Sequence, residues 1–190
     1  MKEDEVLSFI AADARFFDNA AAREQKLSIS KYNQMVIDNI NKTISSEDSI
    51  IFNGIISNGN KEETKEIFSK IKGVKYIIDY KYQEQFTKEE WKEIGFTHIW
   101  DVSGAVDCKI MEKDSYVIIE ADKEMIKRDL IMPTSYVAAP KSMIDTGELY
   151  KNKILNISLK EWGFQPIEIS TRLPQIIDDQ ELFNSMEEEI

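Results

Sequence analysis

Histidine and cysteine are nearly missing from this chain, and their scarcity excludes several kinds of site. Among 190 residues, His98 is the single histidine and Cys108 the single cysteine. A hydrolytic centre built from several imidazoles is therefore excluded, and a serine–histidine–aspartate triad would have to use His98. A lone cysteine excludes an internal disulfide and a cysteine-rich zinc site. We interpret His98 as a structural imidazole at a strand start, with a catalytic base as the alternative, and Cys108 as a small core residue.

Basic residues and long apolar runs are also in short supply. The chain has 24 Lys and Arg against 35 Asp and Glu, a formal net charge of -11. Nucleic acid is bound by neutralising its phosphates with Lys and Arg, so we do not expect it as a partner. No apolar run approaches the roughly 20 residues of a membrane span, and the acidic start MKEDEVLSF does not resemble a signal peptide. We therefore expect a soluble, cytoplasmic protein that does not associate with a membrane.

The rest of the composition is that of a folded globular chain. Apolar residues make up 42% of the sequence and aromatic residues 10%. A chain of this length and composition can bury a sizeable core. We find no internal repeat, low-complexity linker or shift in composition that would mark a second domain. The sequence predicts one domain over residues 1–175, followed by an acidic tail over residues 176–190.

Strand-like and helix-like segments alternate through the first half of the chain. The strands are short apolar runs, and the helices place apolar residues three and four positions apart. Thr87 and Glu90 have the spacing of a capping box, which indicates a helix start. Alternation of this kind predicts a parallel sheet with helical crossovers. The expected strands are Val6 to Ala11, Ser49 to Phe52 and Val74 to Ile78, and the expected helices are Ser30 to Ile44, Lys61 to Ile71 and Thr87 to Gly95.

The pattern changes in the second half. Val106 to Met111 and Ser115 to Glu120 flank a polar turn over residues 112–114, which predicts an antiparallel hairpin. Ile154 to Leu159 and Pro166 to Ile169 have the composition of a pair of late strands. The stretch from Pro133 to Lys153 has the least pattern, and we expect a long surface loop there.

Polar side chains follow the first predicted strand directly. The segment Val6 to Asp18 reads VLSFIAADARFFD, an apolar run that passes through small residues into a polar cluster. Ligands of open α/β sheets bind beyond the carboxyl ends of such strands, so we expect any functional site at this turn. Four aspartates near predicted strand ends can form one oxygen-lined Mg²⁺ or Ca²⁺ site, with solvated or helix-capping carboxylates as the alternative. These are Asp13, Asp18, Asp79 and Asp101.

Four short segments have the placement of the motifs of a known family. They read ADARFFD at residues 12–18, NGII at 53–56, YKYQ at 80–83 and NISLKEWGFQP at 156–166. Together they resemble the calcineurin-like metallophosphoesterases, in the small bacterial and phage subgroup, from about Val6 to Ile169. The resemblance implies an α/β fold in which mixed sheets form a β-sandwich flanked by helices, in four layers α/β/β/α. The segment at 156–166 matches best, and its counterpart in the family is a closing strand pair without a catalytic role.

Most metal ligands of the family are replaced at the matching positions. Asp13 is retained, whereas Arg15 and Asp18 stand where the family has histidines, and Ile55 stands in place of the bridging carboxylate. At the third strand, the family's Gly-Asn-His-Asp is replaced by YKYQ. The resemblance therefore implies a former active-site cleft, or an anion pocket, formed by Asp13, Arg15, Asp18, Ile55, Lys81 and Tyr82.

The chemistry of that family explains why the losses matter. Two divalent cations are held by imidazoles and carboxylates, and one carboxylate bridges them. An aliphatic Ile55 cannot bridge cations, and Arg15 repels them and can pair with Asp13 or Asp18. We therefore expect no catalytic residue, no resident metal and no other cofactor. If any metal is held, we expect a single Mn²⁺ or Mg²⁺ ion on Asp13 and Asp18.

Three functions from different classes follow. We favour a catalytically inactive metallophosphoesterase-like protein, a pseudoenzyme whose surface binds another protein or a second copy of itself. The first alternative is a residual metal-dependent phosphoesterase or phosphodiesterase that uses Asp13. The second is a non-catalytic binder of a small phosphate-containing ligand, with Arg15 and Lys81 forming the anion pocket, although an internal ion pair of Arg15 is the simpler interpretation.

Aromatic residues gather after the third predicted strand. We interpret them as core and rim packing, with an exposed patch for a protein partner as the alternative. They are Tyr76, Tyr80, Tyr82, Phe86 and Trp91.

Overall fold

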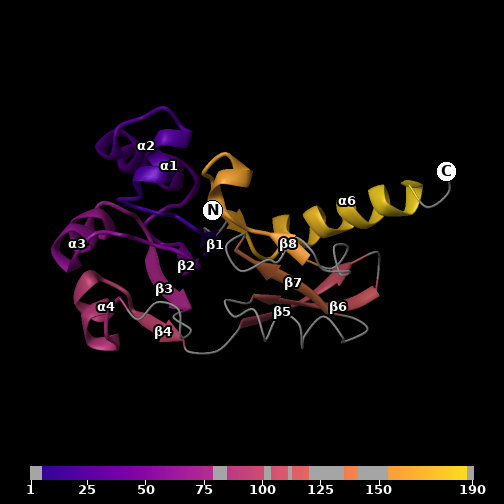
Figure 1. Cartoon of the computed structure of the whole chain (residues 1–190). Coiled ribbons are helices and arrows are strands. Elements are labelled where there is room, and N and C mark those ends of the chain that lie inside the picture. Colours follow the sequence, from indigo (N-terminus) through magenta and orange to yellow (C-terminus); the bar gives the residue numbers. More distant parts are fainter. Residues whose placement is uncertain are drawn as a thin grey trace, which may run out of the picture.

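Two sheets form the centre of the molecule, one of five strands and one of four in the described part of the chain. Figure 1 shows them in the computed structural model of the protein, with most helices gathered on the side of the first sheet. The structure describes residues 6–78, 85–100, 104–110, 113–119, 135–140 and 154–187.

The first sheet has the strand order β4-β3-β2-β1-β9. Strands β1 (Ser8–Ala12), β2 (Ser49–Asn53), β3 (Val74–Ile78) and β4 (His98–Trp100) pair in parallel, and the short β9 (Ile167–Glu168) pairs with β1 in the antiparallel sense. The parallel half expected from the alternation of segments is therefore confirmed. Its carboxyl ends lie at one edge, where the turn after β1 meets the turn after β2.

Helices α1 (Asn19–Glu24), α2 (Ile29–Thr43), α3 (Lys61–Ser69) and α4 (Lys88–Ile94) connect these strands. Successive parallel strands are added in one direction across the sheet, so right-handed crossovers place the helices on the same face. The sequence does not predict α1, because six residues are too few to show a helical period. Side-chain caps start each helix, and they come from Asp18, Ser28, Asn60 and Thr87.

The second sheet has the order β5-β6-β7-β8. Strands β5 (Gly104–Ile110) and β6 (Lys113–Ile119) form the expected antiparallel hairpin, while β7 (Ser135–Ala139) and β8 (Ile154–Asn156) add in parallel. The polar turn expected over residues 112–114 is wrong in its bounds, because Lys113 already pairs with Ile110 and begins β6.

Two other expectations are corrected in this half. The loop predicted from Pro133 to Lys153 contains β7, a short strand whose Val137, Ala138 and Ala139 are buried. The two late strands do not pair with each other, because β8 joins the second sheet and β9 joins the first. Between them lies a 3-10 helix, η3 (Leu159–Trp162), after which Gly163 turns the chain at a φ of 63°.

Two buried cores lie on opposite faces of the first sheet. Phe9 and Ala11 of β1 face the helices, while Ile10 and Ala12 face the core between the two sheets. Helix α6 (Arg172–Glu187) adds Leu173, Ile176 and Ile177 to this second core. The boundary expected at residue 175 therefore lies within a helix. The architecture is mixed α/β, with parallel and antiparallel strand pairs flanked by helices.

Across the residues that the structure describes, no helix has both the length and the apolar character needed to cross a lipid bilayer.

Candidate functional site

Asp13 lies where the carboxyl ends of β1 and β2 meet. The pairing of Ala12 with Asn53 brings the two strand ends together, and the Asp13 N–H donates to the Asn53 carbonyl at 3.0 Å. Its carboxylate Oδ1 accepts the Ile55 N–H at 2.9 Å, and Oδ2 accepts the Ser158 hydroxyl at 2.6 Å. The side chain is buried, with 7% of the residue exposed. Asp13 therefore ties three chain segments together.

The turn after β2 is built on a glycine that approaches this carboxylate closely. Gly54 has a φ of +72°, a conformation that favours glycine. A Cβ on Gly54 would lie 2.4 Å from Asp13 Oδ1 and 2.7 Å from the Cβ of Pro140, the residue after β7. Backbone and proline therefore enclose one side of the Asp13 carboxylate.

The turn after β1 has an unusual backbone. Asp13, Arg15 and Phe17 all have positive φ values, of 50°, 52° and 58°. Non-glycine residues in this region cost roughly 1 kcal/mol or more each and persist only when neighbouring structure fixes them. Hydrogen bonds from the N–H groups of Arg15 and Phe16 to the turn after β2 provide that support, at 3.0 and 2.9 Å. Strained turns of this kind are concentrated at functional sites.

Arg15 and Asp18 pair with each other across the same turn. The Nε and Nη2 atoms of Arg15 each lie 2.8 Å from Asp18 Oδ2, while Oδ1 accepts the N–H groups of Ala20 and Ala21 and caps α1. Burial raises the pKa of Asp18, but these N–H groups and the Arg15 guanidinium outweigh it, so the net pKa is below the usual value. Arg15 therefore binds an acid of its own chain, and its side chain stays 39% exposed.

The lowered pKa of Asp18 predicts a pH-dependent contribution to stability. Asp18→Asn keeps a helix cap and removes the charge, and we expect it to cost about 1 kcal/mol of unfolding free energy at pH 6. A carboxyl with a depressed pKa stabilises the fold above its unfolded value of 3.8 and loses this effect as the pH falls through the folded value. Urea unfolding of both proteins between pH 6 and pH 2.5 should show the difference shrinking below about pH 4. A constant difference would contradict this interpretation.

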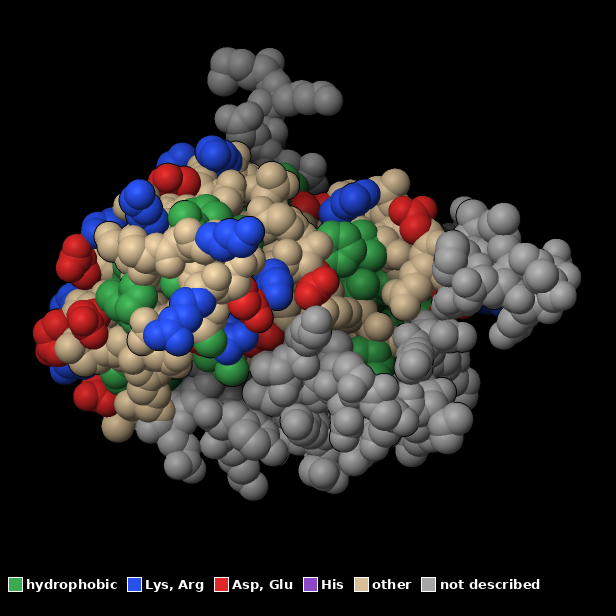
Figure 2. All heavy atoms as spheres, turned by 45° about the horizontal axis from the view of Figure 1, so that its top comes forward, with side chains coloured by type: hydrophobic (Ala, Val, Ile, Leu, Met, Phe, Trp, Pro, Cys, Tyr) green, Lys and Arg blue, Asp and Glu red, His purple; other side chains and the backbone are tan. Residues whose placement is uncertain are grey.

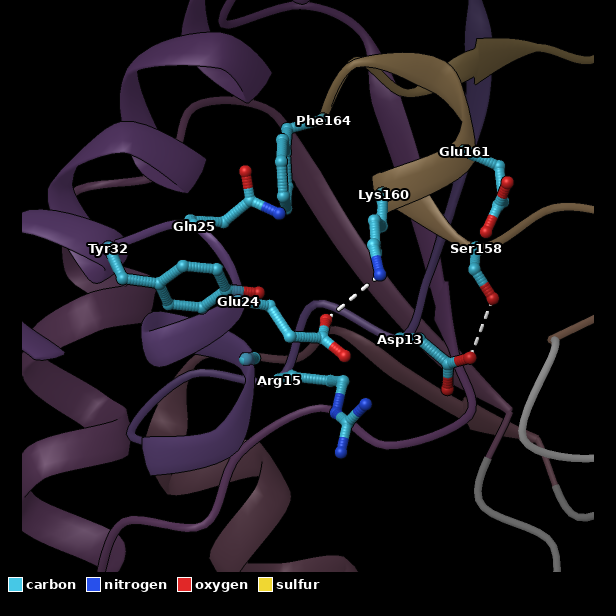
Figure 3. Close-up of a pocket in the computed structure, with 10 residues that line it drawn as sticks. Asp13, Arg15, Glu24, Gln25, Tyr32, Ser158, Lys160, Glu161 and Phe164 are labelled. Atoms are coloured by element: carbon cyan, nitrogen blue, oxygen red, sulfur yellow. Dashed lines mark hydrogen bonds and ion pairs between the residues drawn. The ribbon is translucent and has the colours of Figure 1, made fainter. Parts of the chain in front are cut away.

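A pocket of about 220 Å³ opens beside Asp13, between the turn after β1, the helices α1 and α2, and η3. One wall is aromatic, because the rings of Tyr32 and Phe164 meet edge to face at 5.9 Å. The Tyr32 hydroxyl donates to the Ala14 carbonyl at 3.1 Å, and burial raises the pKa of Tyr32 to about 12, so this hydroxyl stays protonated. Figure 3 shows the side chains around the pocket, among them Asp13, Arg15, Glu24, Tyr32, Lys160 and Phe164.

An ion pair joins two sides of this pocket. Lys160 of η3 lies 2.9 Å from the Glu24 carboxylate at the end of α1, and about half of each side chain is exposed. The hydrogen bond and charge of Lys160 lower the pKa of Glu24. Figure 3 shows the contact as a dashed line, with the Arg15 guanidinium on the far side of the Glu24 carboxylate. Acidic and basic groups are thus paired around the opening.

The structure brings together only part of the predicted site. Asp13 and Arg15 line the pocket, and Asp18 lies beside Arg15. Ile55 contributes its backbone N–H to Asp13 and does not line the pocket. Lys81 and Tyr82 lie outside the described residues, as do two of the candidate metal aspartates, Asp79 and Asp101. Within the described ranges, no three His, Cys, Asp or Glu side chains are grouped so that they could hold a metal ion.

Several pocket residues were not identified from the sequence. Ser158 and Lys160 belong to the segment NISLKEWGFQP at residues 156–166, whose sequence does not indicate a role at the site. Tyr32 lies in the helix expected from Ser30 to Ile44, where its spacing indicates only a place on the apolar face. Glu24 lies in α1, which the sequence does not predict. The hydrogen bond from Ser158 to Asp13 joins residues 145 positions apart, a distance over which no local pattern gives a signal.

The other candidates have structural surroundings. His98 begins β4, is exposed, and stacks on Tyr76 at 4.7 Å with an interplanar angle of 7°. Phe86 and Trp91 are buried in the core beneath the helices, which agrees with core packing for these two aromatics. Tyr80 and Tyr82 lie outside the described residues, and the side chain of Cys108 is likewise outside the description.

Comparisons with known proteins identify a similar fold and no family. Neither models of protein families nor curated proteins match the chain. Among solved structures, the chain is similar to a protein of unknown function, AQ665 from Aquifex aeolicus, with a TM-score of 0.62 and 13% identity. The similarity covers 86% of this chain and 96% of the other. At this identity the likeness concerns the fold alone.

Proposed function

We propose that this protein is a catalytically inactive metallophosphoesterase-like protein that acts by binding a protein partner or a second copy of itself. The observation that carries the proposal is the state of Asp13, the metal ligand that the resemblance retains. Its two carboxylate oxygens accept the Ile55 N–H and the Ser158 hydroxyl. A carboxylate whose two oxygens both hold its own chain together has a structural role, and we assign that role to Asp13.

Charge in the same turn supports this assignment. The Arg15 guanidinium stands at a position where the family has a histidine ligand, and it is paired with Asp18. Like charges repel strongly at short range, so a divalent cation beside Asp13 would be repelled by the guanidinium of Arg15, which lines the same pocket. Ile55 offers no oxygen from its side chain. The site therefore has one unaltered family ligand among the described residues.

The architecture is compatible with the fold that the resemblance implies. Helices pack on the outer face of the first sheet, and its other face packs on the second sheet, as in a β-sandwich flanked by helices. The described residues on the face shown in Figure 2 give no sign of a nucleic-acid partner. On the face shown in Figure 2, Lys and Arg side chains are interspersed with Asp and Glu over the helical part, and the net charge is -11. A protein partner therefore fits better than a polyanion.

Metal binding and hydrolysis test the proposal together. A site with 100-fold excess of Mn²⁺ over its Kd would stabilise the fold by about 2.7 kcal/mol, which corresponds to a Tm rise of roughly 5 to 10 °C for a chain of this size. We expect about 1 mM Mn²⁺ or Mg²⁺ to raise the Tm by less than about 1 °C. We also expect no hydrolysis of bis-p-nitrophenyl phosphate.

The opposite result has a clear meaning. Mn²⁺-dependent hydrolysis that disappears in Asp13→Ala would identify a residual phosphodiesterase and overturn the proposal. Asp38→Ala serves as a matched control, because Asp38 is an exposed acid on α2 away from the turn after β1.

Light scattering on the purified protein then distinguishes a second copy of the chain from a different protein as the partner, since self-association gives a multiple of the 22.0 kDa chain mass.

A further inference from the structure

The pocket beside Asp13 already contains a carboxylate in a position suited to a ligand. Glu24 reaches from the last residue of α1 toward Lys160, with Nζ and Oε2 separated by 2.9 Å. The Arg15 guanidinium lies on its other side (Figure 3), and the positive charges of both Lys160 and Arg15 favour the ionised form of Glu24. Two cationic groups from different segments thus face one carboxylate at the opening.

We propose that this pocket binds the oxyanion group of a small molecule, a carboxylate or a phosphate, between Lys160 and Arg15 in the place of the Glu24 carboxylate. The inference rests on the proposed non-catalytic function, because it requires Arg15 to meet an anion and not a metal centre. It differs from the pocket expected from the sequence in its second cation, which is Lys160 from η3 and not Lys81.

Glu24 can leave this position at little cost. Its side chain is 53% exposed and that of Lys160 is 50% exposed, and ion pairs between such exposed groups contribute little to stability. Glu24 is the last residue of α1, so its side chain can turn into solvent without disturbing a helix interior. The internal carboxylate therefore acts as a weak competitor that an external oxyanion can displace.

The residues that line the pocket indicate what kind of molecule carries the oxyanion group. Tyr32, Phe164 and Ala21 provide apolar surface, and Gln25 provides an amide near Phe164. The cavity volume of about 220 Å³ is smaller than that of sites for drug-sized ligands. The ligand class is thus a small molecule with a compact apolar body and one anionic group. Because Arg15 is already paired with Asp18 and the chain is acidic, we expect affinity in the high micromolar to millimolar range.

Direct titration by calorimetry or NMR in metal-free buffer with EDTA tests the chemistry. The probes are phenyl phosphate, benzoate, inorganic phosphate and benzamide, the last being a neutral analogue of benzoate. We expect at least one aryl oxyanion to bind, and benzamide to bind at least about 10-fold more weakly, because it lacks the charge that replaces Glu24. The stronger of phenyl phosphate and benzoate identifies the group as phosphate or carboxylate.

Variants of the ion pair test the position. Glu24→Gln removes the internal competitor and should tighten binding about 3-fold to 5-fold, whereas Lys160→Gln should weaken it by at least about 5-fold. Glu66→Gln is the matched control, because Glu66 of α3 forms an exposed ion pair with Lys70, the residue after α3, at 2.7 Å, and the substitution should leave binding unchanged. Both pocket variants change exposed side chains, and equal Tm values would show that they fold.

Three outcomes would overturn the inference. They are no oxyanion binding to the wild type or to Glu24→Gln at about 10 mM, equal effects of Glu24→Gln and Glu66→Gln, and binding that requires Mn²⁺. Hydrolysis of phenyl phosphate on addition of Mn²⁺ would instead refute the proposed non-catalytic function, and the metal-free titration would still report on the anion site. The two failures are therefore distinguishable.

Discussion

Gly54→Ala is expected to lower the free energy of unfolding by about 4 kcal/mol, the largest effect of any single methyl group that the described structure suggests. The residue has a φ of +72°, which costs an L-residue roughly 1 to 2 kcal/mol. The added Cβ would also lie 2.4 Å from Asp13 Oδ1 and 2.7 and 2.8 Å from two atoms of the Pro140 ring. Asp13 is held by Ile55 and Ser158, so it cannot move aside cheaply.

Gly163→Ala separates the two contributions. Gly163 has a similar φ of +63°, but a Cβ there would meet no atom of the described residues within 4 Å. We expect this variant to cost only about 1 to 2 kcal/mol, the backbone part of the effect. Urea unfolding of both variants gives the comparison directly. Equal losses would mean that the Asp13 and Pro140 contacts are not tight and that the turn can relax.

Asp13→Ala is expected to cost about 3 kcal/mol, because it leaves the Ile55 N–H and the Ser158 hydroxyl without their acceptor in a buried place. Asp13→Asn should cost less, about 1 kcal/mol, since its amide oxygen can still accept one bond and its amide can donate to the Ser158 oxygen. Ser158→Ala should fall between zero and the loss in Asp13→Ala. Chemical unfolding in metal-free buffer measures all three.

The sign of the change in unfolding free energy in Asp13→Ala distinguishes an acid with a structural role from one kept for metal binding. A carboxylate kept for metal binding is commonly indifferent or unfavourable to the stability of the metal-free protein, so its removal would leave stability unchanged or raised. Asp38→Ala is the control for loss of an exposed acid, and we expect it to change the free energy of unfolding by less than about 0.5 kcal/mol. A stabilised Asp13→Ala would contradict the structural role and restore the metal hypothesis.

The parallel half of the fold could be predicted because its signals are local. Thr87 and Glu90 form the capping box that their spacing indicates, and Ser28 caps α2. The second half contains elements whose signals are not local. Strand β7 has only five residues, SYVAA, which is too short for a period to stand out. The separation of β8 from β9 depends on the turn at Gly163 and on pairing with distant strands, which no window of the sequence contains.

The candidate site likewise has a part with local sequence signals and a part without them. Asp13 and Arg15 could be placed at the carboxyl end of β1, because strand ends follow from the apolar pattern. The partners that define what these residues do are far away in the sequence. Lys160 and Glu24 are 136 positions apart, and their contact is an exposed ion pair. The sequence of neither segment indicates such a contact. Ser158 could only be assigned to Asp13 once the bridge between Ala12 and Ser158 was known.

The position of β1 between β2 and β9 has a consequence for how the chain is made. Ile10 pairs with Ile51 on one side and with Ile167 on the other, so β1 gains its second neighbour only after residue 167 has been synthesised. Pairings over such long sequence separations form slowly. Until then one edge of β1 remains open, and an open strand edge is a template for pairing with other chains. Nascent or truncated chains that end before residue 167 should therefore depend on chaperones more than chains that include β9.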